Sequence, residues 1–283
     1  MTSLPEPDRL EFFQPLTSAA SAVLSEVVAC RGVLWSLWRN EIRVRYAASA
    51  AGLIWALIGP LSLVAIYSIV FGSLLRARIP ALDRPGGYGS FVLSGTMPWL
   101  LVSHVMNQAP GNLLSQGPTL RRFAIPPAHI PATTVLTGLT DMLVASSLFL
   151  IYMAFLRQID LVKLMVLFPA VALLCMMVFG LALGLSALNL YGRDVSHAIG
   201  AFLPFWFFWS PIAYAVPLLS PVLQVFVTLN PLTAFVRLFN WTFSIAPAPS
   251  LVEMVYSVSF ALGAFLLGSF IHQETRKDFM DLL

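Results

Sequence analysis

The sequence predicts an all-α polytopic membrane protein. We expect six transmembrane helices, an N-terminal amphipathic interface helix and an external re-entrant hairpin between spans five and six. Of the 283 residues, 58% are hydrophobic and only 10% are charged, whereas a soluble domain carries about 25% charge. Uncharged runs recur at the length of about 20 residues that a helix needs to cross the hydrocarbon core. These runs do not alternate in short segments, as the strands of a membrane β-barrel would.

The N-terminal region divides into a tail and an amphipathic helix. Residues 1–16 are acidic and contain prolines, so we expect a cytosolic tail and no cleaved signal peptide. Residues 18–46 repeat apolar side chains at helical spacing, which indicates a helix lying in the membrane interface. The alternative is a helix packed on a soluble domain, and the sequence offers no such domain. The residues assigned to the interface helix are Trp35, Trp38, Arg39, Arg43, Arg45 and Tyr46.

Apolar stretches predict the spans in order. The first, 52–75, contains no charge, and a polar loop at 76–87 ends it. The stretch 195–236 lacks Lys, Arg, Asp and Glu, is too long for one span and contains five prolines. We divide it into a fifth span and a hairpin at 219–245, because nonhelical backbone at membrane depth needs protein or water around it. The remaining predictions are spans at 88–108, 132–156, 164–188, 198–218 and 251–271, and a cytosolic tail at 272–283, all within one domain of residues 1–283.

Between the second and third spans lies a segment that a regular membrane helix cannot contain. Residues 113–131, LLSQGPTLRRFAIPPAHIP, place Arg121 and Arg122 among four prolines. Proline breaks a helix interior, and charged side chains are costly in hydrocarbon. We therefore expect this segment to lie in water between two membrane segments.

The distribution of charge predicts the orientation of the chain. Six spans place both termini on one side, and that side would carry ten Lys and Arg residues against six on the other. An excess of basic residues marks the cytosolic side, so both termini are predicted to be cytosolic. This bias also accounts for the net charge of +3, and no nucleic-acid partner is expected.

Several kinds of chemistry are missing from the sequence. It contains no G-x-x-x-x-G-K-[ST] loop for ATP, and Cys30 and Cys175 lack the spacing of a metal site or a matched disulfide. We expect no metal, no cofactor and no catalytic residue in this chain, which would therefore not be an enzyme.

Polar residues within the spans leave alternatives open. Ser94 with His104, or Ser186 with His197, could be imagined as an intramembrane nucleophile and base, although small hydroxyl residues commonly serve helix packing. Asp141 is the one acid well inside a span, and an ionisable group there is a functional hypothesis. An interhelical structural role is favoured over a proton relay, because a relay would need further ionisable groups along a path.

The segment 202–217, FLPFWFFWSPIAYAVP, is the richest aromatic cluster. One interpretation is an aromatic belt at the membrane–water boundary. The other is a surface on which sugar rings stack. Because these rings point in different directions around a helix, only some of them could line a conduit.

Five stretches, in this order along nearly the whole chain, resemble the permeases of polysaccharide and polyol-phosphate exporters of the type-2 ABC transporter family. The first, RNEIRVRYAASAAGLIWALIGP at 39–60, is similar to the junction of that family's interface helix and first span, with a basic R-Y, a small-residue S-x-x-G-x-x-W and a proline. The others are 91–106, 113–132, 191–197 and 230–239.

The resemblance implies a homodimer of six-span permeases in the bacterial inner membrane, with membrane lipids around it and two copies of a separate P-loop ATPase on its cytosolic side. ATP and Mg would be bound by that partner subunit, and the substrate would be a lipid-linked glycan such as an O-antigen, capsule or teichoic-acid-like polymer. Two rival hypotheses remain: a type-2 ABC permease for a drug or small lipid, and a stand-alone secondary transporter.

The resemblance also suggests roles for particular residues. The segment 113–131 would be a short cytosolic helix that docks in a groove of the ATPase, with 191–197 as a second contact. The residues assigned to this coupling are Pro118, Leu120, Arg121, Arg122, Phe123, Pro126, Pro127, Arg193 and Asp194. The candidates for a glycan conduit are Trp55, Tyr67, Trp99, Phe202, Phe205, Trp206, Trp209 and Tyr214. The external hairpin would include Asn230, Pro231 and Arg237.

Overall fold

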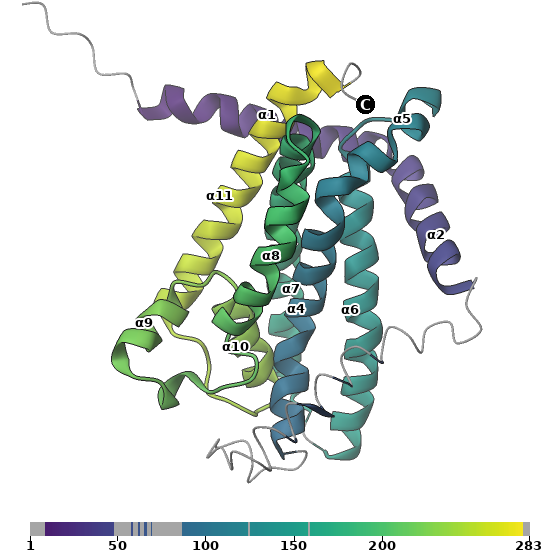
Figure 1. Ribbon diagram of the computed structural model, residues 1–283. Helices are drawn as coiled ribbons and strands as arrows, with labels where there is room; N and C mark the ends of the chain where they lie inside the picture. The colour runs from purple at the N-terminus through teal and green to yellow at the C-terminus, as the bar shows by residue number, and fades with distance from the viewer. Residues whose placement is uncertain are drawn as a thin grey trace, which may run out of the picture.

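The protein is a bundle of helices in the computed structural model (Figure 1). The structure describes residues 9–47, 87–123, 125–157 and 159–279, with isolated residues between 58 and 69. Within these ranges every regular element is a helix, which confirms the all-α prediction. The predicted first span, with Trp55 and Tyr67, and nearly all of the loop at 76–87 lie outside the described residues.

Four long helices form the body of the bundle: α4 (Gly87–Ser115), α6 (His129–Phe155), α7 (Leu161–Tyr191) and α11 (Leu251–Thr275). The predicted spans at 88–108, 132–156, 164–188 and 251–271 each fall within one of them, so these predictions are confirmed as helices. Among the described residues, α6, α7 and α11 are each long and apolar enough to cross a membrane. The bundle is that of a multi-pass membrane protein.

α4 lies at the centre, packed against α6, α7, α8 (Asp194–Trp209) and α10 (Thr233–Thr242). Its position explains why it carries Ser, Thr, His, Asn and Gln side chains along its length, because protein rather than lipid surrounds most of its surface. Val92, Leu101, Val102 and Val105 are fully buried there. Polar residues on such a helix find partners on its neighbours, as buried polar groups require.

The α7–α11 contact is built on glycines. A Cβ atom at Gly180 would overlap the backbone of Ala264 and Phe265, and one at Gly268 would overlap the backbone of Gly180. Small residues let helix backbones approach closely, which replaces the hydrophobic driving force that lipid does not provide. α7 and α11 therefore form a tightly packed pair.

The predicted single interface helix at 18–46 is wrong, because two helices occupy this region. α1 (Arg9–Ala29) crosses one end of the bundle, and α2 (Arg31–Ala47) turns from it and runs beside α6 (Figure 1). The bend between them is 72°. At the break, Nε2 of the buried His129 donates to the carbonyl oxygen of Cys30 over 3.2 Å, and the same oxygen accepts from the backbone N–H groups of Val33 and Leu34 at 2.9 and 3.3 Å. The tail is also shorter than the predicted 1–16, because α1 begins at Arg9.

The fifth predicted span, 198–218, is wrong in its extent. α8 ends at Trp209, and its 16 residues span about 24 Å, less than the roughly 30 Å of a hydrocarbon core. Pro211 explains this end, because the residue before a proline is disfavoured in the α conformation, and Ser210 is extended with ψ 136°. After α8 the chain forms η3 (Val216–Leu218), α9 (Pro221–Thr228) and α10. α9 and α10 are bent by 96° within the predicted hairpin region.

Candidate functional site

The proline-rich segment forms a short helix at one end of the bundle. α5 (Gly117–Phe123) connects α4 to α6 at the end that also carries α1 and the C-terminus (Figure 1). Pro118 is the second residue of α5, where the missing N–H group costs no intrahelical hydrogen bond. Pro126 and Pro127 begin the turn into α6, and their carbonyl oxygens accept from the next turn at 3.0 and 3.2 Å. The segment therefore contains the short helix that the family resemblance implied.

The inner face of α5 is anchored. Leu120 is only 3% exposed, and it belongs to an apolar cluster that joins α5 to the ends of α4, α6 and α7 and to the C-terminal segment. The buried members are Leu113, Leu120, Ile130, Ala187, Leu190 and Phe279. A displacement of α5 would therefore act directly on the ends of three long helices.

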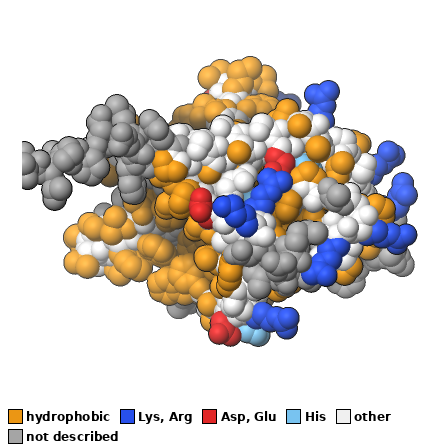
Figure 2. Space-filling view, turned by 90° about the horizontal axis from the view of Figure 1, so that it is seen from above, with side chains coloured by type: hydrophobic (Ala, Val, Ile, Leu, Met, Phe, Trp, Pro, Cys, Tyr) orange, Lys and Arg blue, Asp and Glu red, His pale blue; other side chains and the backbone are white. Residues whose placement is uncertain are grey.

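The outer face of α5 is open and basic. Pro118, Arg121 and Arg122 are exposed, and Phe123 is 63% exposed. The guanidinium carbon of Arg122 lies 5.3 Å from the centre of the Phe123 ring, which is the range of a cation–π contact. Figure 2 looks onto this end and shows Lys and Arg side chains spread over it. An exposed aromatic ring beside cations suits contact with another protein.

The turn between α7 and α8 is held by a side chain from α7. Arg193 and Asp194 are exposed, and Arg193 at the N-cap gives α8 no side-chain hydrogen bond. The buried Asn189 takes over this role, because its Oδ1 accepts from the backbone N–H and the hydroxyl of Ser196 at 3.1 and 2.9 Å. The turn is adjacent to the apolar cluster, to which Leu190 belongs.

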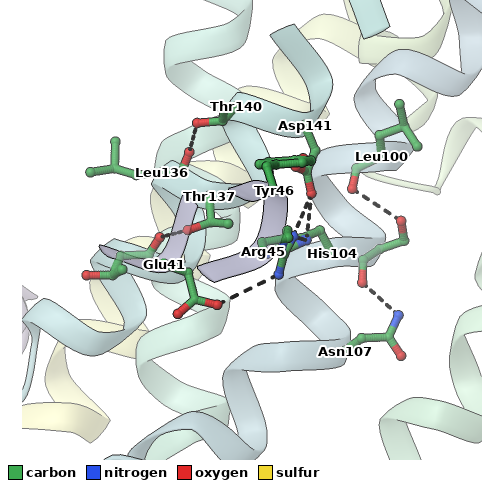
Figure 3. A network of polar contacts seen from close by, with 12 residues as sticks. Glu41, Arg45, Tyr46, Leu100, His104, Asn107, Leu136, Thr137, Thr140 and Asp141 are labelled. Carbon is green, nitrogen blue, oxygen red and sulfur yellow. Dashed lines mark hydrogen bonds and ion pairs between the residues drawn. The ribbon is translucent and has the colours of Figure 1, made fainter. Parts of the chain in front are cut away.

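A polar cluster joins three helices at membrane depth (Figure 3). Asp141 on α6 lies twelve residues after the start of that helix, about 18 Å along its axis. Its Oδ2 accepts from Nη1 of Arg45 at 2.9 Å and lies 3.1 Å from Nδ1 of His104 on α4. Its Oδ1 accepts from the hydroxyl of Tyr46. Glu41 lies 4.0 Å from the Arg45 guanidinium. Both oxygens of the carboxylate are satisfied by donors from α2 and α4.

Two further features fix this cluster. A Cβ atom at Gly138, nearly one turn from Asp141, would lie 2.9 Å from Cδ2 of His104, so the glycine leaves room for the imidazole ring. The indole N–H of Trp38 on α2 donates to Oγ1 of Thr140 on α6 over 3.0 Å. The polar partners of Asp141 therefore come from α2 and α4.

A polar cavity of about 360 Å³ adjoins the cluster and extends toward α5. It lies between α2, α4, α5 and the start of α6. The polar residues that line it are Asn40, Glu41, Arg45, His104, Gln108, Asn112, Ser115, Gln116, Thr119, Thr133, Thr134 and Thr137. A cavity with this many polar partners is large enough to hold water.

The opposite end of the bundle has its own ion pair. Nη1 of Arg237 on α10 lies 2.6 Å from both carboxylate oxygens of Glu253, which is 2% exposed. Glu253 also forms a capping box with Ser250 at the start of α11. Asn230 accepts from the indole N–H of Trp206 at 2.9 Å and donates to Ser210 at 2.9 Å, while the carbonyl oxygen of Pro231 accepts from Ser257. The residues predicted for the external hairpin thus hold α8, α10 and α11 together.

The described conduit candidates fall into three groups. Trp99 and Trp206 are buried at 8% and 4% exposure, with ring centroids 6.4 Å apart. Trp209 and Tyr214 are half-buried, and their polar atoms bond to the carbonyl oxygens of α9 and of the end of α8. Phe202 and Phe205 are exposed on α8 at 38% and 52%. A conduit role for these residues stays a prediction, and the exposed pair on α8 has the surface for it.

The imagined nucleophile and base do not meet. The hydroxyl of Ser94 donates to Oδ1 of Asn240, while His104 lies against Asp141. Ser186 donates to the carbonyl oxygen of Leu183 within its own helix. Within the described ranges, no group of three His, Cys, Asp or Glu side chains is placed to hold a metal ion.

Comparison with known proteins agrees with this architecture. The ABC-2 type transporter family matches residues 32–244. An O-antigen export system permease protein RfbA of Myxococcus xanthus is 24% identical over 263 residues, which covers 92% of this chain and 98% of the relative. A protein of the same name from Klebsiella pneumoniae is 22% identical over 198 residues, 70% of this chain and 74% of the relative. The chain belongs to the ABC-2 type transporter family, and the resemblance predicted from its motifs is confirmed.

Sequence reasoning missed several residues of these sites. His104 was considered only as a base for Ser94, and Asn189, Asn240 and Glu253 were given no role. His104 could have been recognised because it lies on a predicted span without charged side chains, and because Asp141, the one acid within the next predicted span, needs a polar partner. For Asn189 the signal was a helix start without Ser, Thr, Asp or Asn at its N-cap.

Proposed function

We propose that this chain is the permease subunit of an ATP-driven exporter that moves a lipid-linked polysaccharide across the bacterial inner membrane. A separate P-loop ATPase, in two copies, hydrolyses ATP, and two copies of this chain form the membrane path. Six spans and two cytosolic termini belong to the same proposal. The full-length match to relatives named O-antigen export permeases supports the substrate class.

The observation that carries the proposal is the two-faced helix α5. Its inner face holds Leu120 in the apolar cluster, and its outer face presents Arg122 and Phe123 to water. An element fixed to three long helices on one side and open on the other is suited to receive force from a partner. The basic surface of this end supports its orientation toward the cytosol.

The mechanism follows from this placement. Closure of the ATPase pair pushes α5 and the α7–α8 turn, and the attached helices shift as rigid elements. The first span and α8 then separate at the homodimer interface and open a path for the glycan, with Phe202 and Phe205 along it. At the outer end, the Arg237–Glu253 pair and Asn230 hold the hairpin that closes the path. The permease provides a conduit with two states, and ATP binding by the partner shifts their populations.

The proposal is tested with the permease and its ATPase subunit expressed together. We expect the two to copurify, and a permease deletion to accumulate lipid-linked glycan on the cytosolic side. Replacing Arg122 and Phe123 together by Ala should reduce copurification and export by about tenfold, the loss expected when an exposed aromatic anchor is removed from an interface.

The control is Phe155→Ala, which removes an exposed ring, 84%, at the last residue of α6, the end of that helix remote from α5. It should copurify as the wild type does. Export of glycan by the unaltered chain without any ATPase, or normal export by the Arg122/Phe123 double variant, would contradict the proposal.

A further inference from the structure

Asp141 connects elements that are distant in the sequence but meet at one carboxylate. Arg45 and Tyr46 at the end of α2 bind both of its oxygens, and His104 of α4 lies against one of them. The Asp141, His104 and Arg45 side chains are 18%, 11% and 30% exposed. An ionised group at membrane depth needs such partners, so the three helices are held together wherever this carboxylate stays charged.

The placement of the cluster relates it to α5. α4, α5 and α6 are consecutive, so α4 and α6 are the two arms of a helical hairpin whose tip is α5. The cluster bridges both arms, through His104 on one and Asp141 on the other. α2 packs on α6, and its last residues are those that bind Asp141. A movement that α5 imposes on the arms therefore reaches α2 through this cluster.

The cavity explains why the connection is made by charge. Arg45 and His104 line a polar space that extends from the cluster to α5, so an apolar contact would be partly wetted there. A carboxylate that accepts from the Arg45 guanidinium at 2.9 Å and lies 3.1 Å from Nδ1 of His104 remains a directional contact beside water. Charge-assisted hydrogen bonds of this kind are about twice as strong as neutral ones.

We propose that Asp141 is a positioning residue of the transport cycle, which ties α2 to the α4–α5–α6 hairpin so that a displacement of α5 is transmitted to α2 and to the chain that follows it. The inference rests on the proposed function, because the displacement is that of an ATPase acting on α5. Arg45, Tyr46 and His104 are the groups through which the tie acts.

The first experiment compares coupling in the complete exporter, with permease and ATPase reconstituted together in lipid vesicles. ATP hydrolysis and ATP-dependent glycan transport are measured in parallel for Asp141→Asn. We expect assembly and ATP hydrolysis close to wild type and glycan transported per ATP lower by about tenfold, the scale of loss when a coupling contact is broken. Asp160→Asn makes the same chemical change at the N-cap of α7, away from α2, and should leave the amount of glycan transported per ATP unchanged.

Two further variants separate positioning from a general loss of structure. Gly138→Ala leaves all four polar side chains in place but presses on the His104 ring, and it should also lower the amount of glycan transported per ATP. The charge exchange Arg45→Asp with Asp141→Arg should recover part of the transport that either single variant loses. Normal transport per ATP by Asp141→Asn would overturn the proposal.

The second experiment measures how closely α2 is held to α6 in the absence of substrate. In a chain with Cys30→Ala and Cys175→Ala, the pair Trp38→Cys and Thr140→Cys is introduced where α2 and α6 touch, and a bifunctional thiol reagent joins the two thiols. Cross-linking should be slower in the Asp141→Asn background, and the completed cross-link should restore transport. Equal cross-linking rates, or a cross-linked Asp141→Asn complex that stays uncoupled, would overturn the tie. If the wild-type complex hydrolyses ATP but moves no glycan, the proposed function fails, while the cross-linking rates still test the tie.

Discussion

Two arginine–carboxylate pairs of the bundle, Arg237–Glu253 and Arg45–Asp141, join different kinds of elements. Arg237 and Glu253 are 16 residues apart, and Glu253 is 2% exposed within a capping box. Arg45 and Asp141 are 96 residues apart, with side chains 30% and 18% exposed beside a polar cavity. The first pair fixes a corner between neighbouring segments, and the second joins helices that only the tertiary fold brings together.

This difference indicates that the Arg237–Glu253 pair makes the local structure rigid, whereas the Arg45–Asp141 pair transmits movement between helices. A carboxylate enclosed by its own cap and one arginine has no water to replace a lost partner, so it stabilises one arrangement strongly. A carboxylate beside a polar cavity can exchange partners with water at a smaller cost. We therefore expect the Arg237–Glu253 pair to matter most for folding and the Arg45–Asp141 pair to matter most for coupling.

The largest expected effect comes from disrupting the α7–α11 packing. In Gly180→Ala, the added methyl group overlaps the backbone of α11, and the tight α7–α11 packing must open. We expect a loss of about 3 kcal/mol or more, because overpacking against backbone cannot relax by side-chain movement. Thermal unfolding in detergent, followed by tryptophan fluorescence, measures it. Gly263→Ala, where a Cβ meets nothing within 4 Å, is the control and should keep or raise the stability.

The next effect tests the comparison itself. Glu253→Gln leaves Arg237 without its ion pair in a closed site, and about 3 kcal/mol of stability should be lost. Asp141→Asn should cost less, about 1 kcal/mol, because water from the cavity can replace a lost hydrogen bond. Unfolding of both variants under the same conditions decides the order. A greater loss of stability for Asp141→Asn than for Glu253→Gln would contradict the distinction between the two pairs.

A smaller effect concerns the anchor of α5. Leu120→Ala removes a buried side chain from the apolar cluster and should cost about 2 kcal/mol, at the low end for such truncations because the site lies at the end of the bundle. Hydrogen exchange of the α5 amides should become faster. Phe123→Ala, which truncates an exposed ring on the same helix, should leave that exchange unchanged, and an equal acceleration would argue against the anchored face.

The smallest effect sharpens the description of the α7–α8 turn. Asn189→Ala removes the acceptor for the backbone N–H of Ser196 and should cost about 1 kcal/mol, as the loss of an N-cap does. Asn189→Asp keeps the acceptor oxygen and should be nearly neutral. The difference between the two variants in thermal unfolding measures the cap, and no difference would refute this role.

Much of the helical architecture could be predicted from local pattern. Four of the predicted spans coincide with α4, α6, α7 and α11, because long apolar runs bounded by polar turns leave few other solutions in a membrane. The short helix α5 was predicted through motif resemblance, since seven residues with two arginines have no hydrophobic signal of their own. The family itself was recognisable from an ordered set of motifs.

The predictions that failed concern the break between α1 and α2, the end of α8 and the partners of Asp141. The break between α1 and α2 at Cys30 lies against His129, which is 99 positions away in the sequence, and the helical periodicity of the apolar residues continues through the break. The end of α8 depends on Pro211, but the residues that follow it are also apolar, so the sequence pattern predicts that the span continues. The partners of Asp141 could not be named from the sequence, because nothing in the local pattern places Arg45 and His104 beside it.

The bend between α1 and α2 has a practical consequence. Cys30 is a free, partly exposed thiol at the point where the two helices change direction. Once Cys175 is replaced, a maleimide dye could be attached there without introducing a foreign residue. Its emission colour and anisotropy would then report changes in the surroundings and mobility of the bend as nucleotide is added, in membranes as well as in detergent.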